Sequence, residues 1–293
     1  MFDLRYHVAS LAAVFLALII GILVGVGISG PVDNQKTKFL EAQVAKYQRQ
    51  LDQTASQSSV NAREEQAALA YINETYPVLA RNRLRGKQIA VVFVGPVKEG
   101  IRSSVNRLFL DSGAQQLRLR ALNVPIEGRQ LDASLRGQPA AAGLRGRKNV
   151  EELGRALGQE LALGGDTPLW DTLGEALAND RQGPNKPPAD GVVVVRTADP
   201  QRGATSRFLL GLYSGLGDAP VPAVGVEQTD AAAPATKAFA QAGLSSVDDV
   251  DTVVGRLATV LLLAGASTGQ YGVKDSATNG ALPPWPTRSA AGG

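Results

Sequence analysis

The chain has 293 residues, of which 44% are hydrophobic and 19% are charged, so it can bury a globular core and is not wholly disordered. Because it contains no cysteine, a disulfide scaffold, a thiolate metal centre and a cysteine nucleophile are all excluded. One histidine and one methionine provide almost no ligands for a transition metal, and a net charge of +3 does not indicate a nucleic-acid partner. We therefore expect no metal site, no cofactor and no nucleic acid.

The first predicted element is an apolar segment at residues 8–28, in which Ser10 is the only ordinary polar residue. A bilayer core requires about 20 apolar helical residues, so this segment is long enough to span one. A cleaved signal peptide is the alternative, but its apolar region is expected to cover only about 7 to 15 residues. We predict a transmembrane anchor within residues 1–30.

Small residues recur at every fourth position of this segment and would lie on one face of the helix. They are Ala9, Ala13, Ala17, Gly21 and Gly25. Such a face lets a second helix approach closely, although alanine and glycine are also common in membrane helices without this role. The pattern predicts a helix dimerisation face.

A coiled-coil stalk is predicted over residues 31–80. The residues between 34 and 76 lack proline and favour one long helix, for which Pro77 provides a stop. Apolar residues alternate by four and three, are replaced by polar residues in the middle, and return near the end. The predicted seam consists of Leu40, Val44, Tyr47, Leu51 and Ile72. Together with the small-residue face, it predicts a parallel homodimer.

An α/β domain is predicted over residues 81–272. Apolar, β-branched runs at residues 88–95, 117–122, 191–196 and 221–226 are typical of buried strands, and helical sequence separates them. Such alternation favours a mostly parallel sheet covered on both faces, in a Rossmann-like, three-layer arrangement. Residues 125–146 have no clear periodicity, and we predict a disordered tail over residues 273–293.

Neither of the two motifs suggestive of chemistry survives inspection. The stretch GASTG around Ser267 matches a hydrolase pattern, but helical sequence precedes it and the one histidine, His7, lies at the membrane edge. Asp248, Asp249 and Asp251 lack the spacing of a calcium loop and instead predict the N-terminus of a helix, capped by a preceding serine. We therefore predict no catalytic residue and no enzyme activity.

The opening sequence FDLRYHVASLAAVFLAL, which begins at Phe2 and continues through Gly25, strongly resembles the start of the MctB family of copper transport proteins. VDDVD at residues 247–251 and GQYG at residues 269–272 resemble the C-terminal signature of that family. The resemblance implies a single-pass membrane protein with a coiled-coil stalk, an α/β domain outside the cytoplasm and a role in copper efflux or homeostasis. Some members look like partners in daughter-cell separation.

Two functions follow as expectations. The first is a membrane-anchored protein of copper transport or homeostasis that acts without ligating copper, because Met1 and His7 are the only soft or imidazole ligands. The alternative is a dimeric envelope scaffold that recruits a cell-wall or cell-separation protein. The expected partners are the lipid bilayer, a second copy of the chain and an envelope protein. Basic residues after the apolar segment favour a cytoplasmic domain, whereas the resemblance implies an external one.

Overall fold

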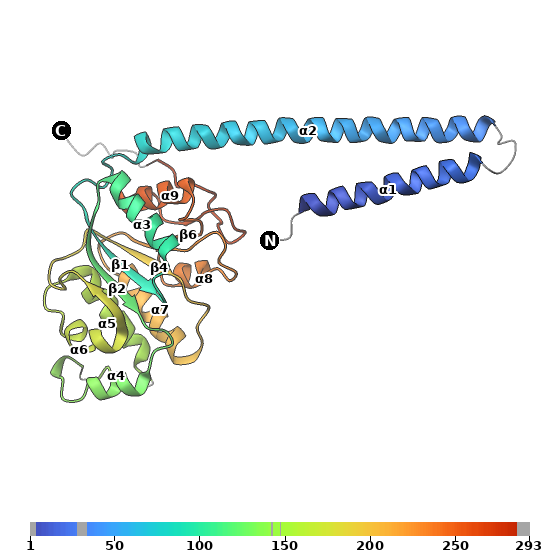
Figure 1. Ribbon diagram of the computed structural model, residues 1–293. Coiled ribbons are helices and arrows are strands. Elements are labelled where there is room, and N and C mark those ends of the chain that lie inside the picture. Colours follow the sequence, from blue (N-terminus) through green and yellow to red (C-terminus); the bar gives the residue numbers. More distant parts are fainter. Residues whose placement is uncertain (1–3, 28–33, 142, 147, 286–293) are drawn as a thin grey trace. The chain divides into compact units, whose positions relative to one another are not determined.

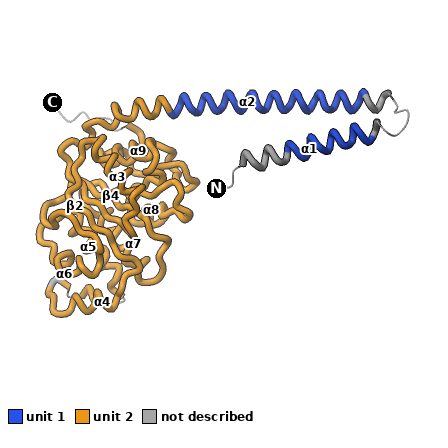
Figure 2. The backbone as a smooth tube through the Cα atoms, in the orientation of Figure 1, with its two compact units in different colours: residues 1–69 blue, residues 70–293 orange. Residues whose placement is uncertain are grey.

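The computed structural model describes the backbone of residues 4–27, 34–141, 143–146 and 148–285. The chain divides into two compact units, Met1–Leu69 and Ala70–Gly293, which Figure 2 shows in different colours. The first unit consists of helix α1 (Leu4–Gly27) and the larger part of helix α2 (Asn34–Ala80). The second unit contains the sheet.

Helix α1 carries the predicted dimerisation face. Ala13, Ala17 and Gly21 lie along it, and the space beside Gly21 is open. The side chain of Ala9 lies outside the described residues. Among the described residues, no helix has both the length and the apolar character that crossing a membrane requires.

Helix α2 carries the predicted coiled-coil seam. Leu40, Val44, Tyr47 and Leu51 are 44%, 37%, 60% and 69% exposed, so none of them is buried within the described chain. Ile72 differs, because its side chain is half-buried and it falls in the part of α2 that belongs to the second unit. The first four seam positions are therefore accessible to another chain, whereas Ile72 is only partly so.

The last turns of α2 are fastened to the α/β domain. Tyr76 and Ala80 are buried in a small apolar cluster with Leu257 and Leu261 of helix α9 (Val253–Leu263). Pro77 does not end α2 as predicted, since the helix continues to Ala80. Burial of Tyr76 and Ala80 offsets the backbone hydrogen bond that Pro77 cannot donate.

The second unit is built around a seven-stranded sheet in the order β3-β2-β1-β4-β5-β6-β7. Figure 1 labels β1, β2, β4 and β6 of this sheet. All neighbouring strands are parallel except β2 and β3. The strands are β1 (Gln88–Val94), β2 (Gln115–Leu122), β3 (Ala178–Gln182), β4 (Gly191–Arg196), β5 (Ala223–Val226), β6 (Ser245–Val247) and β7 (Gln270–Tyr271). This arrangement confirms the predicted α/β class and mostly parallel sheet.

Helices cover both faces of the sheet. The remaining helices of this unit are α3 (Glu99–Ser112), α4 (Gly128–Ser134), α5 (Val150–Leu163), α6 (Pro168–Leu177), α7 (Gly203–Gly217) and α8 (Thr236–Gln241). On one face of the sheet Ala90, Val92 and Val94 of β1 join an apolar cluster with α5 and α7, and on the other Ile89 and Phe93 join a cluster with α3 and α9. A short 3₁₀ turn, η1 (Pro139–Ala141), lies between α4 and α5.

Three segments differ from the sequence-based expectation. The polar strand β3 follows α6 directly, in a stretch where no strand was predicted, because it pairs with the edge of β2 rather than burying both faces. The aperiodic stretch at residues 125–146 contains α4 and η1. The predicted tail makes hydrogen bonds with the domain from Val273 onward, and residues 286–293 lie outside the described residues.

Two arginines of β2 are buried without a carboxylate partner. Arg118 is 1% exposed and donates to the carbonyl of Leu161, in the last turn of α5, at 2.9 Å. Arg120 donates to the carbonyls of Gln182 and Gly183 at 2.6 and 3.1 Å. Burial, together with the neighbouring arginine, lowers the pKa of Arg118 to about 10. These guanidinium groups satisfy carbonyls that a helix end and a loop leave unpaired.

Glycines permit the close contact between α5 and α7. Gly154 and Gly158 on α5 face the backbone of α7, while Gly211 and Gly215 on α7 face the backbone of α5. A Cβ atom at Gly211 would overlap the carbonyl oxygen of Glu151. The two helices therefore pack backbone against backbone, a contact that no larger residue allows.

We expect Gly211→Ala to destabilise the domain by about 3 kcal/mol, because the methyl group forces the two helices apart. The matched control is Gly128→Ala, since a Cβ atom there meets nothing within 4 Å. It should change stability by less than about 0.5 kcal/mol. Urea unfolding of the full chain in detergent, followed by the fluorescence of buried Trp170, measures both. Equal stability of the two variants would contradict this packing.

Candidate functional site

The carboxyl edge of the sheet is the place where open parallel sheets bind ligands. The chain passes from β1 to β2 on one side and then crosses to β4 on the other, so the strand order reverses between β1 and β4. The loops after β1 and β4 are closely packed at this point. The Thr197 hydroxyl donates to the carbonyl of Pro96 at 2.7 Å, and Gly95, with φ at 108°, leaves room for Ala198.

A buried ion network lies beside this reversal point, at the ends of β4 and β5. Arg196, at the end of β4, donates to Glu227 through Nε at 3.1 Å and through Nη2 at 2.9 Å. Lys274 reaches Glu227 at 3.4 Å and donates to the carbonyl of Gln228 at 2.8 Å. The side chains of Arg196, Glu227 and Lys274 are only 9%, 2% and 15% exposed. The network ties the C-terminal segment to the ends of two strands.

This network has consequences for ligand binding. A cavity of about 230 Å³ lies beside it, between the loops that follow β1, β4 and β5. Arg196, which lines this cavity, already donates hydrogen bonds to Glu227 and to the carbonyls of Ala198 and Ala233. The charges at the reversal point therefore hold the fold together. Sequence reasoning missed this network, for which the only signal was an Arg and a Glu placed directly after two apolar strand runs.

The acidic cluster of Asp248, Asp249 and Asp251 precedes helix α9 as predicted, but the residue that caps the helix is a threonine. Thr252 caps α9, and its hydroxyl accepts the N–H of Gly255 at 2.9 Å. Ser245 and Ser246 lie in strand β6, so the prediction of a serine cap was wrong. Both serines are buried, and β6 pairs with β5 and β7 in the sheet. They are therefore not placed at the N-terminus of α9.

The three aspartates of this cluster hold separate segments. Asp248 accepts the N–H of Val273 at 2.9 Å, and Asp249 accepts the hydroxyl of Thr252 at 2.8 Å. Asp251 accepts the N–H of Thr229, in the loop after β5, at 2.8 Å. Within the described residues, no group of three or more potential ligands among His, Cys, Asp and Glu is arranged to hold a metal ion.

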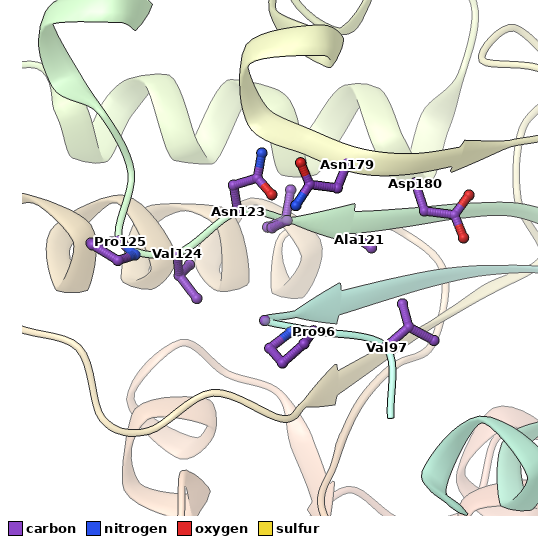
Figure 3. A pocket seen from close by; sticks show the side chains of 10 residues that line it. Pro96, Val97, Ala121, Asn123, Val124, Pro125, Asn179 and Asp180 are labelled. Atoms are coloured by element: carbon purple, nitrogen blue, oxygen red, sulfur yellow. The ribbon is translucent and has the colours of Figure 1, made fainter. Parts of the chain in front are cut away.

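A cavity of about 430 Å³ lies at the carboxyl ends of β1 and β2 (Figure 3). Pro96 and Val97 come from the loop after β1, and Val124 follows β2. Asn123 and Asn179 contribute carboxamides, and Asp180 lies on β3. The cavity thus combines apolar walls with two carboxamides and one carboxylate.

Ser267 of the GASTG stretch has no catalytic surroundings. Helix α9 precedes it and strand β7 follows, which reverses the strand-then-helix order that a nucleophile elbow requires. Its carbonyl accepts the hydroxyl of Tyr271 at 3.0 Å. His7 is the one histidine in the sequence, and its side chain is not among those that the structure describes.

The structure thus defines a protein with N-terminal helices and an α/β domain whose carboxyl edge holds a buried ion network. The chain belongs to the MctB family, because the family model, described as copper transport outer membrane protein, matches residues 1–282. This match confirms the resemblance seen in the first residues and in the C-terminal signature. The family is one of transport proteins and not of enzymes. No curated protein matches the chain.

The buried Asp249 gives a testable pH dependence. Burial, aided by the neighbouring Asp248 and Asp251, raises the pKa of Asp249 above its ordinary value. The folded state therefore binds a proton more readily than the unfolded state, and stability falls as pH rises through the ordinary pKa toward the raised one. The substitution Asp249→Asn retains an oxygen that accepts the hydrogen bond from the Thr252 hydroxyl, but the side chain carries no charge.

We expect the stability of Asp249→Asn, relative to the natural chain, to increase as the pH rises above 3.8, the ordinary pKa of an aspartate. Urea unfolding below and above this pH gives the difference. The control is Asp230→Asn, an exposed aspartate in the loop after β5, which should show no such trend. A difference for Asp249→Asn that is independent of pH would contradict the assignment.

Proposed function

We propose that the chain is a membrane-anchored protein of copper homeostasis that acts without enzyme activity and without ligating copper itself. The family match over nearly the whole chain supports the copper role. The residue inventory supports indirect action, because copper(I) prefers thiolate and thioether ligands and copper(II) prefers imidazole. The full chain offers no cysteine, one methionine and one histidine. Copper, as cargo, is then handled by another component.

The proposed anchor is the apolar segment at residues 8–28. Its composition matches a single membrane helix, and both of its ends extend beyond the residues whose side chains are described. We place the α/β domain outside the cytoplasm, on the strength of the family resemblance. A single helix does not enclose a pore, so transport by this chain alone would require several copies.

A second candidate function is a dimeric envelope scaffold that recruits another protein. The observation that favours it is the exposed seam on α2, where Leu40, Val44, Tyr47 and Leu51 follow a coiled-coil spacing. A second copy of the chain supplies an identical stripe, and parallel pairing would bury both. The two functions are compatible, since a scaffold that positions an envelope protein also alters copper handling.

Cysteine cross-linking tests the dimer, since the chain has no cysteine of its own. We expect Val44→Cys and Leu51→Cys to form disulfide dimers in most chains upon mild oxidation, because equivalent seam positions face each other in a parallel pair. Ala42→Cys and Arg49→Cys lie on the other side of the helix and are the matched controls. More efficient cross-linking of the controls would contradict the seam.

Cellular copper content separates direct from indirect action. In cells that depend on the full chain, we expect the double variant Val44→Asp, Leu51→Asp to reproduce the copper content of the deletion, because charges at the seam separate the helices. The control pair Ala42→Asp, Arg49→Asp and the variant His7→Ala should retain normal copper content at equal expression. Loss of copper control in His7→Ala alone would overturn indirect action.

A further inference from the structure

The cavity at the ends of β1 and β2 lies beside a β-bulge in strand β3. Strand β3 pairs with β2 in register at Asp180 with Ala121 and at Ala178 with Leu122, which leaves Asn179 as an extra residue. Such a bulge redirects a side chain at the edge of a sheet. Here Asn179 lines the same cavity as Asn123, and Figure 3 shows the two carboxamides directed toward one another.

The two carboxamides are available to a ligand. Asn123 uses its backbone N–H to bind the carbonyl of Leu177 at 2.7 Å, while its side chain makes no hydrogen bond within the described chain. The side chain of Asn179 likewise has no partner among the described residues, and it is exposed. Each carboxamide offers both a donor and an acceptor in one plane.

The rest of the lining restricts the class of ligand. The walls are apolar and consist largely of Pro96, Val97 and Val124. Among the described residues, no lysine, arginine or histidine lines the cavity, and Asp180 contributes a negative charge, so phosphates and other anions are disfavoured. The described lining also has no aromatic side chain on which a sugar ring would stack. A neutral or cationic ligand that combines amide groups with small apolar groups fits best.

We propose that this cavity binds an extended peptide segment of a partner protein. Asn123 and Asn179 pair with the N–H and C=O groups of the peptide backbone, and one small apolar side chain enters between Val97 and Val124. Strand β3 is the last strand of the sheet on this side and pairs with no described strand except β2, so the peptide continues as an added strand along it. The inference rests on the scaffold function proposed above and names where that partner is held.

The experiment uses the full chain in lipid nanodiscs as bait for a displayed library of random linear heptapeptides. The Kd of each enriched peptide is then measured by fluorescence anisotropy. We expect Asn123→Asp and Asn179→Asp to weaken binding about tenfold each, because the new carboxylate has nearly the same shape but lacks the amide donor. The matched control is Asn106→Asp on α3, an exposed carboxamide without a hydrogen-bond partner in the described chain, which should leave Kd unchanged.

Three results would overturn the proposal. They are the absence of any enriched peptide, equal affinity of the peptides for Asn123→Asp and the natural chain, and binding at this cavity by oligosaccharide probes but not by peptides. The copper content of cells carrying the α2 seam variants is scored separately. If that seam dependence is found while peptide binding fails, the scaffold function stands and the peptide site alone is rejected.

Discussion

The domain depends on burying both faces of its central strands. Val192, Val193, Val194 and Val195 of β4 are all 0% exposed, and β1 is apolar over the same length. A strand of this composition is stable only when helices cover the sheet on both sides, which requires parallel strands joined by crossover helices. The helix layers must then pack tightly, and the glycines of α5 and α7 allow their backbones to meet.

A sheet covered on both faces leaves its edges and ends as the places for polar chemistry. Buried charge occurs there, and it is compensated within the chain: Arg118 serves the end of α5, while Arg196 and Lys274 share Glu227. Removing such groups from water costs free energy, which the hydrogen bonds offset only because each guanidinium or ammonium has several acceptors. At the cavity beside β1 and β2, the carboxamides of Asn123 and Asn179 have no hydrogen-bond partner among the described residues.

This distribution of polar groups bears on how a member of a copper transport family works. Its described residues bring no cluster of metal ligands together, and the whole chain has almost none of the ligands that copper prefers. What the chain does present is an exposed apolar seam on α2 and a cavity lined by amides. Both features are suited to contact with proteins, so the copper role we propose acts through an assembly.

The sequence by itself determined the α/β class, the strands β1 and β4, the long helix α2 and the family, because continuous apolar runs and local periodicity are short-range signals. It did not reveal strand β3, because its sequence is polar and its backbone hydrogen bonds to the edge of β2 leave no local pattern in the sequence. Nor did it indicate the Arg196–Glu227 pair or the alignment of Asn123 with Asn179, residues that lie far apart in the chain. Only the tertiary structure decided those, since it alone brings distant strand ends together and fixes which polar groups are satisfied internally.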